Sequence, residues 1–167
     1  MRTAALVARL AAALRQAAAT MATAESCTGG LVAAACTDLA GSSDWFERGV
    51  VCYSNAAKVE LLGVDATLIV EHGAVSSEVA MAMARGTLAM SPARFAVAVT
   101  GVAGPGGGTG AKPVGTVWLA VCERGASAEA TLLQASGDRA AVRACAVERA
   151  LQLLLGAVER GAAGRRA

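Results

Sequence analysis

The chain has 167 residues and a formal net charge of +2. That length is typical of one domain with a complete hydrophobic core, and so small a charge gives no support for a nucleic-acid or membrane-surface partner. Hydrophobic residues make up 55% of the chain, yet no apolar run reaches the roughly 18 residues of a spanning helix. Because the N-terminus is typical of an amphipathic helix and not of a signal peptide, we expect a cytoplasmic protein.

Hydrophobic periodicity and turn residues predict alternating helices and strands. The predicted helices span residues 4–19, 28–39, 56–62, 76–90 and 138–158. The predicted strands span residues 20–25, 49–53, 94–100, 114–122 and 128–134. Since the elements alternate early and a hairpin follows late, we expect an α/β fold with helices on both faces of a mixed sheet. We expect one domain over residues 1–160 and a frayed tail over 161–167.

The cysteines and the histidine argue against a metal site. There are five cysteines, an odd number, and no two are spaced C-x-x-C. This usage is typical of reduced thiols in a cytosolic protein. With only one histidine and no cysteine cluster in the sequence, we expect no metal and no cofactor.

The most informative segment is residues 23–30, with the sequence TAESCTGG, which links a predicted strand to a predicted helix. A hydroxyl there meets the N–H groups and the positive dipole of a helix N-terminus, which suits anion binding or attack on a carbonyl. Ser26 is either an N-cap or a nucleophile. Thr28 is a second candidate for the cap, and Cys27 is an alternative nucleophile because a helix N-terminus lowers a thiol pKa.

Two consecutive glycines, Gly29 and Gly30, occupy the first predicted helical turn. Each destabilises a helix by about 1 kcal/mol relative to alanine. A close approach by a ligand is the usual reason for such a pair, so we predict that this turn contacts the substrate.

A hydroxyl nucleophile needs a base. The only histidine, His72, lies in a predicted turn, where a surface or capping role is favoured over catalysis. Lys58 lies in the first turn of the helix predicted at 56–62, where the helix dipole disfavours a cation and would lower the pKa of the amine. Lys58 is therefore either a solvated surface residue or a base for Ser26.

Two further segments are candidates for binding an anion. The glycine-rich loop that follows the strand at 94–100 includes Thr100, Gly101 and Gly104, and its N–H groups could hold a phosphate, although it matches no nucleotide fingerprint. Arg139 and Arg143 are one turn apart at the start of the last helix, where cations are disfavoured unless an anion is near. A solvated face, or pairing with a nearby carboxylate, is the alternative for this arginine pair.

Taken together and in order, these segments resemble the CinA C-terminal domain family, the nicotinamide-nucleotide amidases. The matching stretches are TAESCTGG at 23–30, AGSS at 40–43, WFERG at 45–49, YSNAAK at 53–58, HGAVS at 72–76, TGVAGPGG at 100–107, KPVGTV at 112–117 and SGDR at 136–139. They cover residues 23 to about 155 of this sequence. One departure is Cys52, where the family pattern has Thr or Val.

The resemblance implies a three-layer α/β/α sandwich that often self-associates, so a homo-oligomer is expected. It also implies hydrolysis of nicotinamide mononucleotide to nicotinate mononucleotide and ammonia. Ser26 would be the nucleophile, Lys58 the base and Tyr53 a nearby proton relay. The substrate-binding residues would be Cys27, Thr28, Gly29, Gly30, Thr100, Gly101, Gly104, Arg139 and Arg143. Two alternatives stay open: a nucleotide-binding domain of this fold without catalysis, and an amidase for another small amide.

Overall fold

The fold is described from a computed structural model, which covers residues 2–163. Residues 164–167 of the expected tail lie outside the described residues, while residues 161–163 continue the last helix. Over residues 2–163, no helix combines the length and the apolar sequence needed to cross a bilayer.

Helices and strands alternate up to the second strand, three helices then precede the third strand, and the expected hairpin follows late in the chain. The helices are α1 (Arg2–Gln16), α2 (Leu31–Thr37), the short 3-10 helix η1 (Ser42–Asp44), α3 (Asn55–Leu62), α4 (Ala66–His72), α5 (Ser77–Ala89) and α6 (Arg139–Ala163). The strands are β1 (Met21–Glu25), β2 (Phe46–Val51), β3 (Phe95–Gly101), β4 (Thr116–Glu123) and β5 (Glu129–Gln134).

The five strands form one mixed sheet in the order β2-β1-β3-β4-β5. β1 runs parallel to both β2 and β3, whereas β4 is antiparallel to β3 and to β5. In the parallel part, Glu25 is paired with Val51 on one side and with Val99 on the other. The carboxyl ends of β1, β2 and β3 therefore meet at one edge of the sheet.

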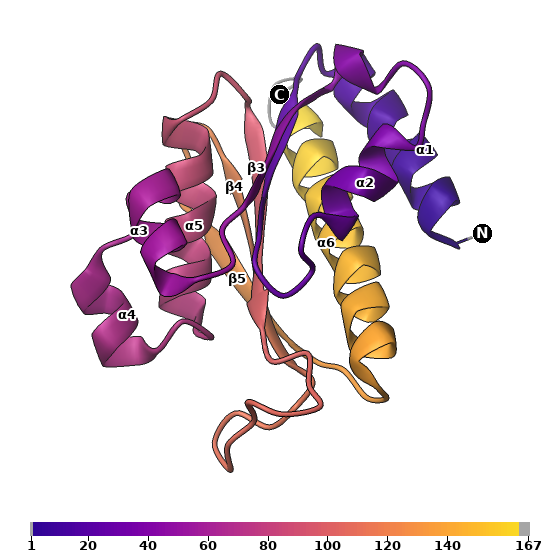
Figure 1. Ribbon diagram of the computed structural model, residues 1–167. Coiled ribbons are helices and arrows are strands. Elements are labelled where there is room, and N and C mark those ends of the chain that lie inside the picture. Colours follow the sequence, from indigo (N-terminus) through magenta and orange to yellow (C-terminus); the bar gives the residue numbers. More distant parts are fainter. Residues whose placement is uncertain (1, 164–167) are drawn as a thin grey trace.

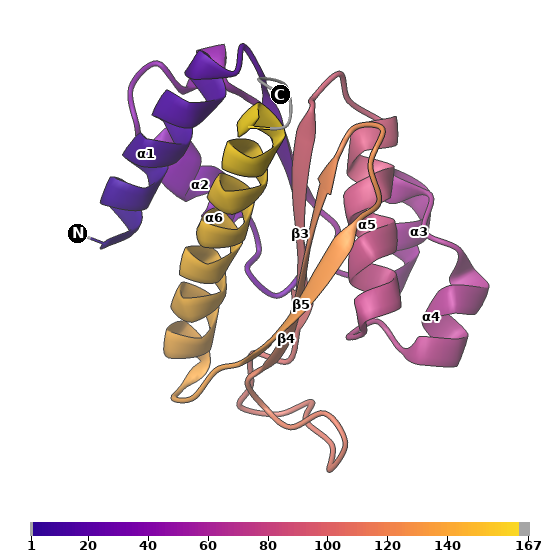
Figure 2. The same cartoon turned by 180° about the vertical axis from the view of Figure 1, so that it is seen from behind.

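Helices cover both faces of the sheet, which confirms the expected three-layer sandwich. Helices α1, α2 and α6 lie on one face, and α3, α4 and α5 lie on the other (Figures 1 and 2). β3 faces both layers: Phe95, Val97 and Val99 belong to the core under α1 and α6, while Ala96 and Ala98 belong to the core under α5. The small alanine side chains let α5 pack close to the sheet.

Three of the differences between the structure and the sequence prediction concern α2, β2 and α4. Helix α2 begins at Leu31 instead of residue 28, because Gly29 and Gly30 have φ values of 60° and 96°, outside the helical region. β2 starts earlier than predicted and ends at Val51. Helix α4 was not predicted; Asp65 caps it, and His72 is its last residue rather than part of a turn.

Candidate active site

The candidate site lies at the carboxyl ends of the three parallel strands, as is usual for open α/β sheets. Ser26 follows β1 directly, and its N–H donates to Val99 O of β3 at 2.9 Å. Tyr53 follows β2, and Lys58 lies in the first turn of α3. A cavity of about 210 Å³ is lined by residues from all of these segments.

The structure brings together the two residues predicted to carry the chemistry. Lys58 Nζ lies 3.0 Å from Ser26 Oγ. Both residues are buried, with Lys58 1% and Ser26 8% exposed. Ser26 Oγ accepts no hydrogen bond from an amide of α2 and donates instead to Tyr53 O at 3.3 Å. The interpretation of Ser26 as an N-cap is therefore wrong, and Lys58 is not a solvated surface residue.

Two main-chain carbonyls fix the amine of Lys58. Its Nζ donates to Cys52 O at 3.0 Å and to Tyr53 O at 3.1 Å. These oxygens are available because β2 ends at Val51 and the chain turns toward α3. Burial lowers the pKa of the Lys58 amine below its ordinary value, although the neighbouring Cys52, Cys27 and Tyr53 groups partly oppose this.

The environment of Cys27 argues against the thiol as nucleophile. Cys27 is 6% exposed, and burial raises the pKa of its thiol to about 11. The helix N-terminus was expected to lower this pKa, but desolvation outweighs that effect. A thiol with this pKa is almost entirely protonated at neutral pH and is a weak nucleophile.

Glu25, which sequence reasoning missed, caps α2. Its carboxylate accepts hydrogen bonds from the N–H groups of Gly30 and Val32 at 3.0 Å and of Ala33 at 2.8 Å. Thr23 donates to the same carboxylate, and Glu25 is only 1% exposed. An internal anion therefore occupies the positive end of α2, where the sequence suggested that Ser26, Thr28 or a ligand would bind.

The glycines of the turn at residues 26–30 are required by its backbone conformation. Gly29 and Gly30 adopt positive φ, which explains the glycine pair without a ligand contact. The N–H of Gly29 donates to Ser26 O at 3.0 Å, and that of Gly30 is held by Glu25. Neither amide is thus available to a substrate. The Thr28 hydroxyl is buried and has no hydrogen-bond partner among the described residues.

The two arginines predicted to hold phosphate have different surroundings. Arg139 borders the cavity, where its guanidinium donates to Gly104 O at 2.9 Å and to the Tyr53 hydroxyl at 3.1 Å. Arg143 instead donates to two carbonyls of the turn, Cys27 O at 3.1 Å and Thr28 O at 2.9 Å. Both arginines belong to the same chain as the nucleophile they approach, but only Arg139 lines the cavity.

The other predicted residues lie around the cavity with mixed roles. Thr100 and Gly101 line it, and the Thr100 hydroxyl donates to Ala74 O at 2.8 Å. Gly101 packs against β4, since a Cβ there would lie 2.8 Å from Thr116 O. The Tyr53 side chain is 58% exposed, and among the described residues its hydroxyl makes no hydrogen bond to Ser26 or Lys58. What contacts Lys58 is the Tyr53 carbonyl.

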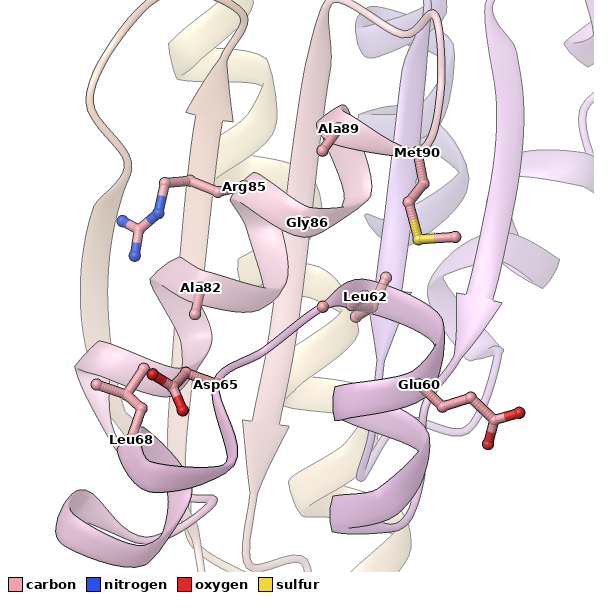
Figure 3. A pocket seen from close by; sticks show the side chains of 10 residues that line it. Glu60, Leu62, Asp65, Leu68, Ala82, Arg85, Gly86, Ala89 and Met90 are labelled. Atoms are coloured by element: carbon pink, nitrogen blue, oxygen red, sulfur yellow. The ribbon is translucent and has the colours of Figure 1, made fainter.

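A larger cavity, of about 610 Å³, lies between α3, α4 and α5 (Figure 3). Glu60, Asp65 and Arg85 surround it, and Figure 3 shows the end of α3 at Leu62 lying against α5 at Gly86. It contains no serine, cysteine or lysine. Of these two cavities, the Ser26 cavity is therefore the one that combines a hydroxyl nucleophile with an amine base.

Comparison with known proteins gives close relatives. A protein of Pseudomonas putida called nicotinamide-nucleotide amidohydrolase PncC is 55% identical over 150 residues, which cover 90% of this chain and 93% of that one. A protein of the same name from Escherichia coli K12 is 51% identical over 142 residues, covering 85% and 86% of the two chains.

Solved structures agree with the sheet and helices described above. A competence/damage-inducible protein from Agrobacterium tumefaciens superposes with a TM-score of 0.92 at 42% identity, covering 95% of this chain and 96% of that one. A CinA superfamily protein from Klebsiella pneumoniae gives a TM-score of 0.90 at 39% identity, covering 95% and 98%. The family model of the CinA C-terminal domain matches residues 3–158. The chain belongs to the CinA C-terminal domain family.

Proposed function

We propose that this chain hydrolyses the carboxamide of nicotinamide mononucleotide, giving nicotinate mononucleotide and ammonia. The observation that carries the chemistry is the 3.0 Å approach of Lys58 Nζ to Ser26 Oγ inside a cavity. The substrate comes from relatives at 51–55% identity that are called nicotinamide-nucleotide amidohydrolases. Geometry and relatives thus support one reaction class, hydrolysis of an amide through an activated serine.

The surroundings of Lys58 suit a neutral amine acting as a base. A neutral amine has two N–H bonds and one lone pair, and two carbonyls, Cys52 O and Tyr53 O, accept from Nζ. In the structure Nζ also donates to Ser26 Oγ, whose own proton points to Tyr53 O; loss of that third Nζ proton would leave a lone pair facing the Ser26 hydroxyl. Burial, which lowers the pKa of Lys58, favours this neutral form.

The reaction would proceed through an acyl-enzyme. Ser26 Oγ attacks the carboxamide carbon as its proton passes to Lys58, and the carbonyl oxygen becomes an oxyanion. The C–N bond then breaks, and Lys58 returns the proton to the leaving nitrogen, so ammonia departs. Water, activated by the neutral Lys58, hydrolyses the ester and frees Ser26. Because the Tyr53 hydroxyl is bonded to Arg139, Lys58 is better placed than Tyr53 for the proton return.

The phosphate would bind at the side of the cavity that Arg139 borders. Arg139 is exposed, and it is the one arginine among the described residues that line this cavity. Its contacts with Gly104 O and the Tyr53 hydroxyl hold the guanidinium at the mouth without neutralising its charge. Thr100 and Gly101 line the same cavity and would contact the ribose.

Ammonia release from nicotinamide mononucleotide by the purified chain tests the proposal. We expect turnover that falls by at least about 10³-fold in Ser26→Ala and in Lys58→Met. Nicotinamide and its riboside serve as controls, because only the mononucleotide offers a phosphate to Arg139. Tight binding of the mononucleotide without ammonia release would instead support a non-catalytic nucleotide-binding domain. Equal turnover of all three compounds would support an amidase with a different substrate.

A further inference from the structure

The guanidinium of Arg143 holds two consecutive carbonyls of the nucleophile turn. Its Nε donates to Cys27 O at 3.1 Å and its Nη2 donates to Thr28 O at 2.9 Å. Arg143 comes from α6, 115 residues along the chain from Thr28, and is half-buried. A planar, permanently charged fork that bridges two successive peptide groups restricts the rotation of both.

Holding a carbonyl also fixes the direction of the N–H in the same peptide group. In a trans peptide the C=O and the following N–H point to opposite sides. Arg143 at Cys27 O therefore directs the Thr28 N–H away from α6. A cation bonded to the carbonyl also polarises that peptide group, which makes its N–H a stronger donor.

Among the described residues, two amide N–H groups of the turn have no main-chain or carboxylate acceptor. Gly29 donates to Ser26 O and Leu31 donates to Thr28 O. The N–H groups of Gly30, Val32 and Ala33 donate to the Glu25 carboxylate. No carbonyl or carboxylate within residues 2–163 accepts from the amides of Cys27 and Thr28.

These two amides directly follow the nucleophile in the chain. The N–H of the residue after a catalytic serine is a common oxyanion donor, because it lies beside the atom that attacks. The helical N–H groups of α2, which the sequence suggested for this role, are already taken by Glu25. The Cys27 and Thr28 amides are therefore the available donors for the oxyanion that forms on Ser26.

We propose that Arg143 is a positioning residue, which orients the Cys27–Thr28 peptide group so that the Thr28 N–H joins the Cys27 N–H in stabilising the oxyanion, and that it does not bind the substrate phosphate. This inference rests on the proposed amidase function. As the Ser26 Oγ–carbon bond forms, the electron pair of the carbonyl moves to oxygen and the Ser26 proton moves to Lys58. Arg143 itself gives up no proton and touches no reacting atom.

Steady-state kinetics of Arg143→Gln and Arg143→Lys, with nicotinamide mononucleotide as substrate, test this role. We expect kcat to fall by about 10²-fold in Arg143→Gln while KM changes by less than about threefold, because the oxyanion forms only in the transition state. Arg143→Lys should lose less, since one ammonium can still hold one carbonyl. Millimolar guanidinium should restore part of the activity of Arg143→Ala.

Arg139→Gln is the matched control, one turn earlier on the same helix and with the same loss of charge. Its KM for the mononucleotide should rise by about tenfold or more, with a smaller change in kcat. If Arg143→Gln behaves in the same way, or retains its full kcat, the positioning role is overturned.

Hydrogen exchange provides a readout that does not depend on turnover. The Gly29 and Gly30 amides should exchange at least about tenfold faster in both Arg143→Lys and Arg143→Gln, but not in Arg139→Gln. Unchanged exchange in both Arg143 variants would refute the claim that Arg143 holds the turn. If the wild-type chain released no ammonia, the proposed function would fail, and the exchange rates would still decide whether Arg143 holds the turn.

Discussion

Lys58 Nζ lies 3.0 Å from Ser26 Oγ, although the two residues are 32 positions apart. Parallel pairing of β1 with β2 creates this approach, because Ser26 follows one strand and the segment leading to Lys58 follows the other. The contact places a serine hydroxyl against an amine that burial favours in its neutral form.

The activity should depend on the protonation of Lys58. The base must be neutral, so kcat/KM should rise with pH and level off above the folded-state pKa of Lys58, which lies below the ordinary 10.5. The pH dependence of ammonia release between mildly acidic and alkaline pH measures this limb. A kcat/KM that is flat with pH, or that falls as pH rises, would contradict the role of Lys58 as base.

The same shift predicts how stability depends on pH. Between the lowered folded pKa and the unfolded value of 10.5, the unfolded chain binds more protons at Lys58, so its contribution to stability rises with pH. Below that window, the destabilisation from burying a charged amine is fully present. Lys58→Met should therefore gain stability relative to wild type at low pH, and this gain should shrink toward pH 10.5. Urea unfolding of both chains at several pH values gives the difference in their free energies of unfolding. A difference that does not change with pH would contradict the lowered pKa of Lys58.

Replacement of Cys27 should have little effect on turnover. Because burial raises the pKa of its thiol to about 11, Cys27→Ala should keep kcat within about threefold of wild type. The oxyanion donor proposed at this position is the main-chain N–H, which alanine retains. The measurement is ammonia release by Cys27→Ala beside Ser26→Ala, and an equal loss in both would restore the thiol as a candidate nucleophile.

Glu25 should be important for stability as well as for the site. Its carboxylate accepts from the Gly30 amide and from two amides of α2, so Glu25→Gln places an amide NH₂ against a donor and should lower the free energy of unfolding by about 1–3 kcal/mol. Asp65→Asn is the control, since Asp65 caps α4 at an exposed site and asparagine is itself a good N-cap, so its loss should be clearly smaller. Denaturant titration of the two variants compares them; equal losses would show that burial of the Glu25 cap is unimportant.

The contact between α3 and α5 requires a glycine at position 86. A Cβ there would lie 2.0 Å from Leu62 O, so Gly86→Ala must push α3 away and should destabilise the protein by about 3 kcal/mol or more. Since α3 also carries Lys58, kcat should fall too. Gly156→Ala, within α6, meets only the end of the Arg160 side chain and should stabilise by about 0.5–1 kcal/mol. Thermal unfolding separates the two, and a stable, fully active Gly86→Ala would show that α3 tolerates the displacement.

The local pattern was enough to predict helices on both faces of a mixed sheet and to make Ser26 and Lys58 candidates, and the family resemblance assigned their roles, but contacts between distant residues were beyond the local pattern. Ser26 and Lys58 stand out because each occupies the end of a strand or the start of a helix. Glu25 reads as an ordinary strand residue, and only its position in the folded chain shows that it reaches the α2 amides. The contact of Arg143 with Thr28 spans 115 residues, so no local spacing could reveal it.

Backbone conformation accounts for the other differences. The glycine pair at 29 and 30 was interpreted as a ligand contact, whereas both residues adopt positive φ before α2 begins. Helix α4 has only seven residues, too few for a helical period to stand out from its surroundings.

The internal capping of α2 by Glu25 separates two functions that many anion-binding enzymes combine in one helix N-terminus. The Glu25 carboxylate supplies the negative charge at the N-terminus of α2, so no anionic ligand is needed there. Under the proposed function, the choice among substrates would then fall to Arg139 and the loop that follows β3, which also line the cavity. Variation in that loop and in the first turn of α6 would then alter which amides are accepted while Ser26 and Lys58 stay unchanged. Under the proposed function, the specificity of this chain could therefore change without a change in its reacting residues.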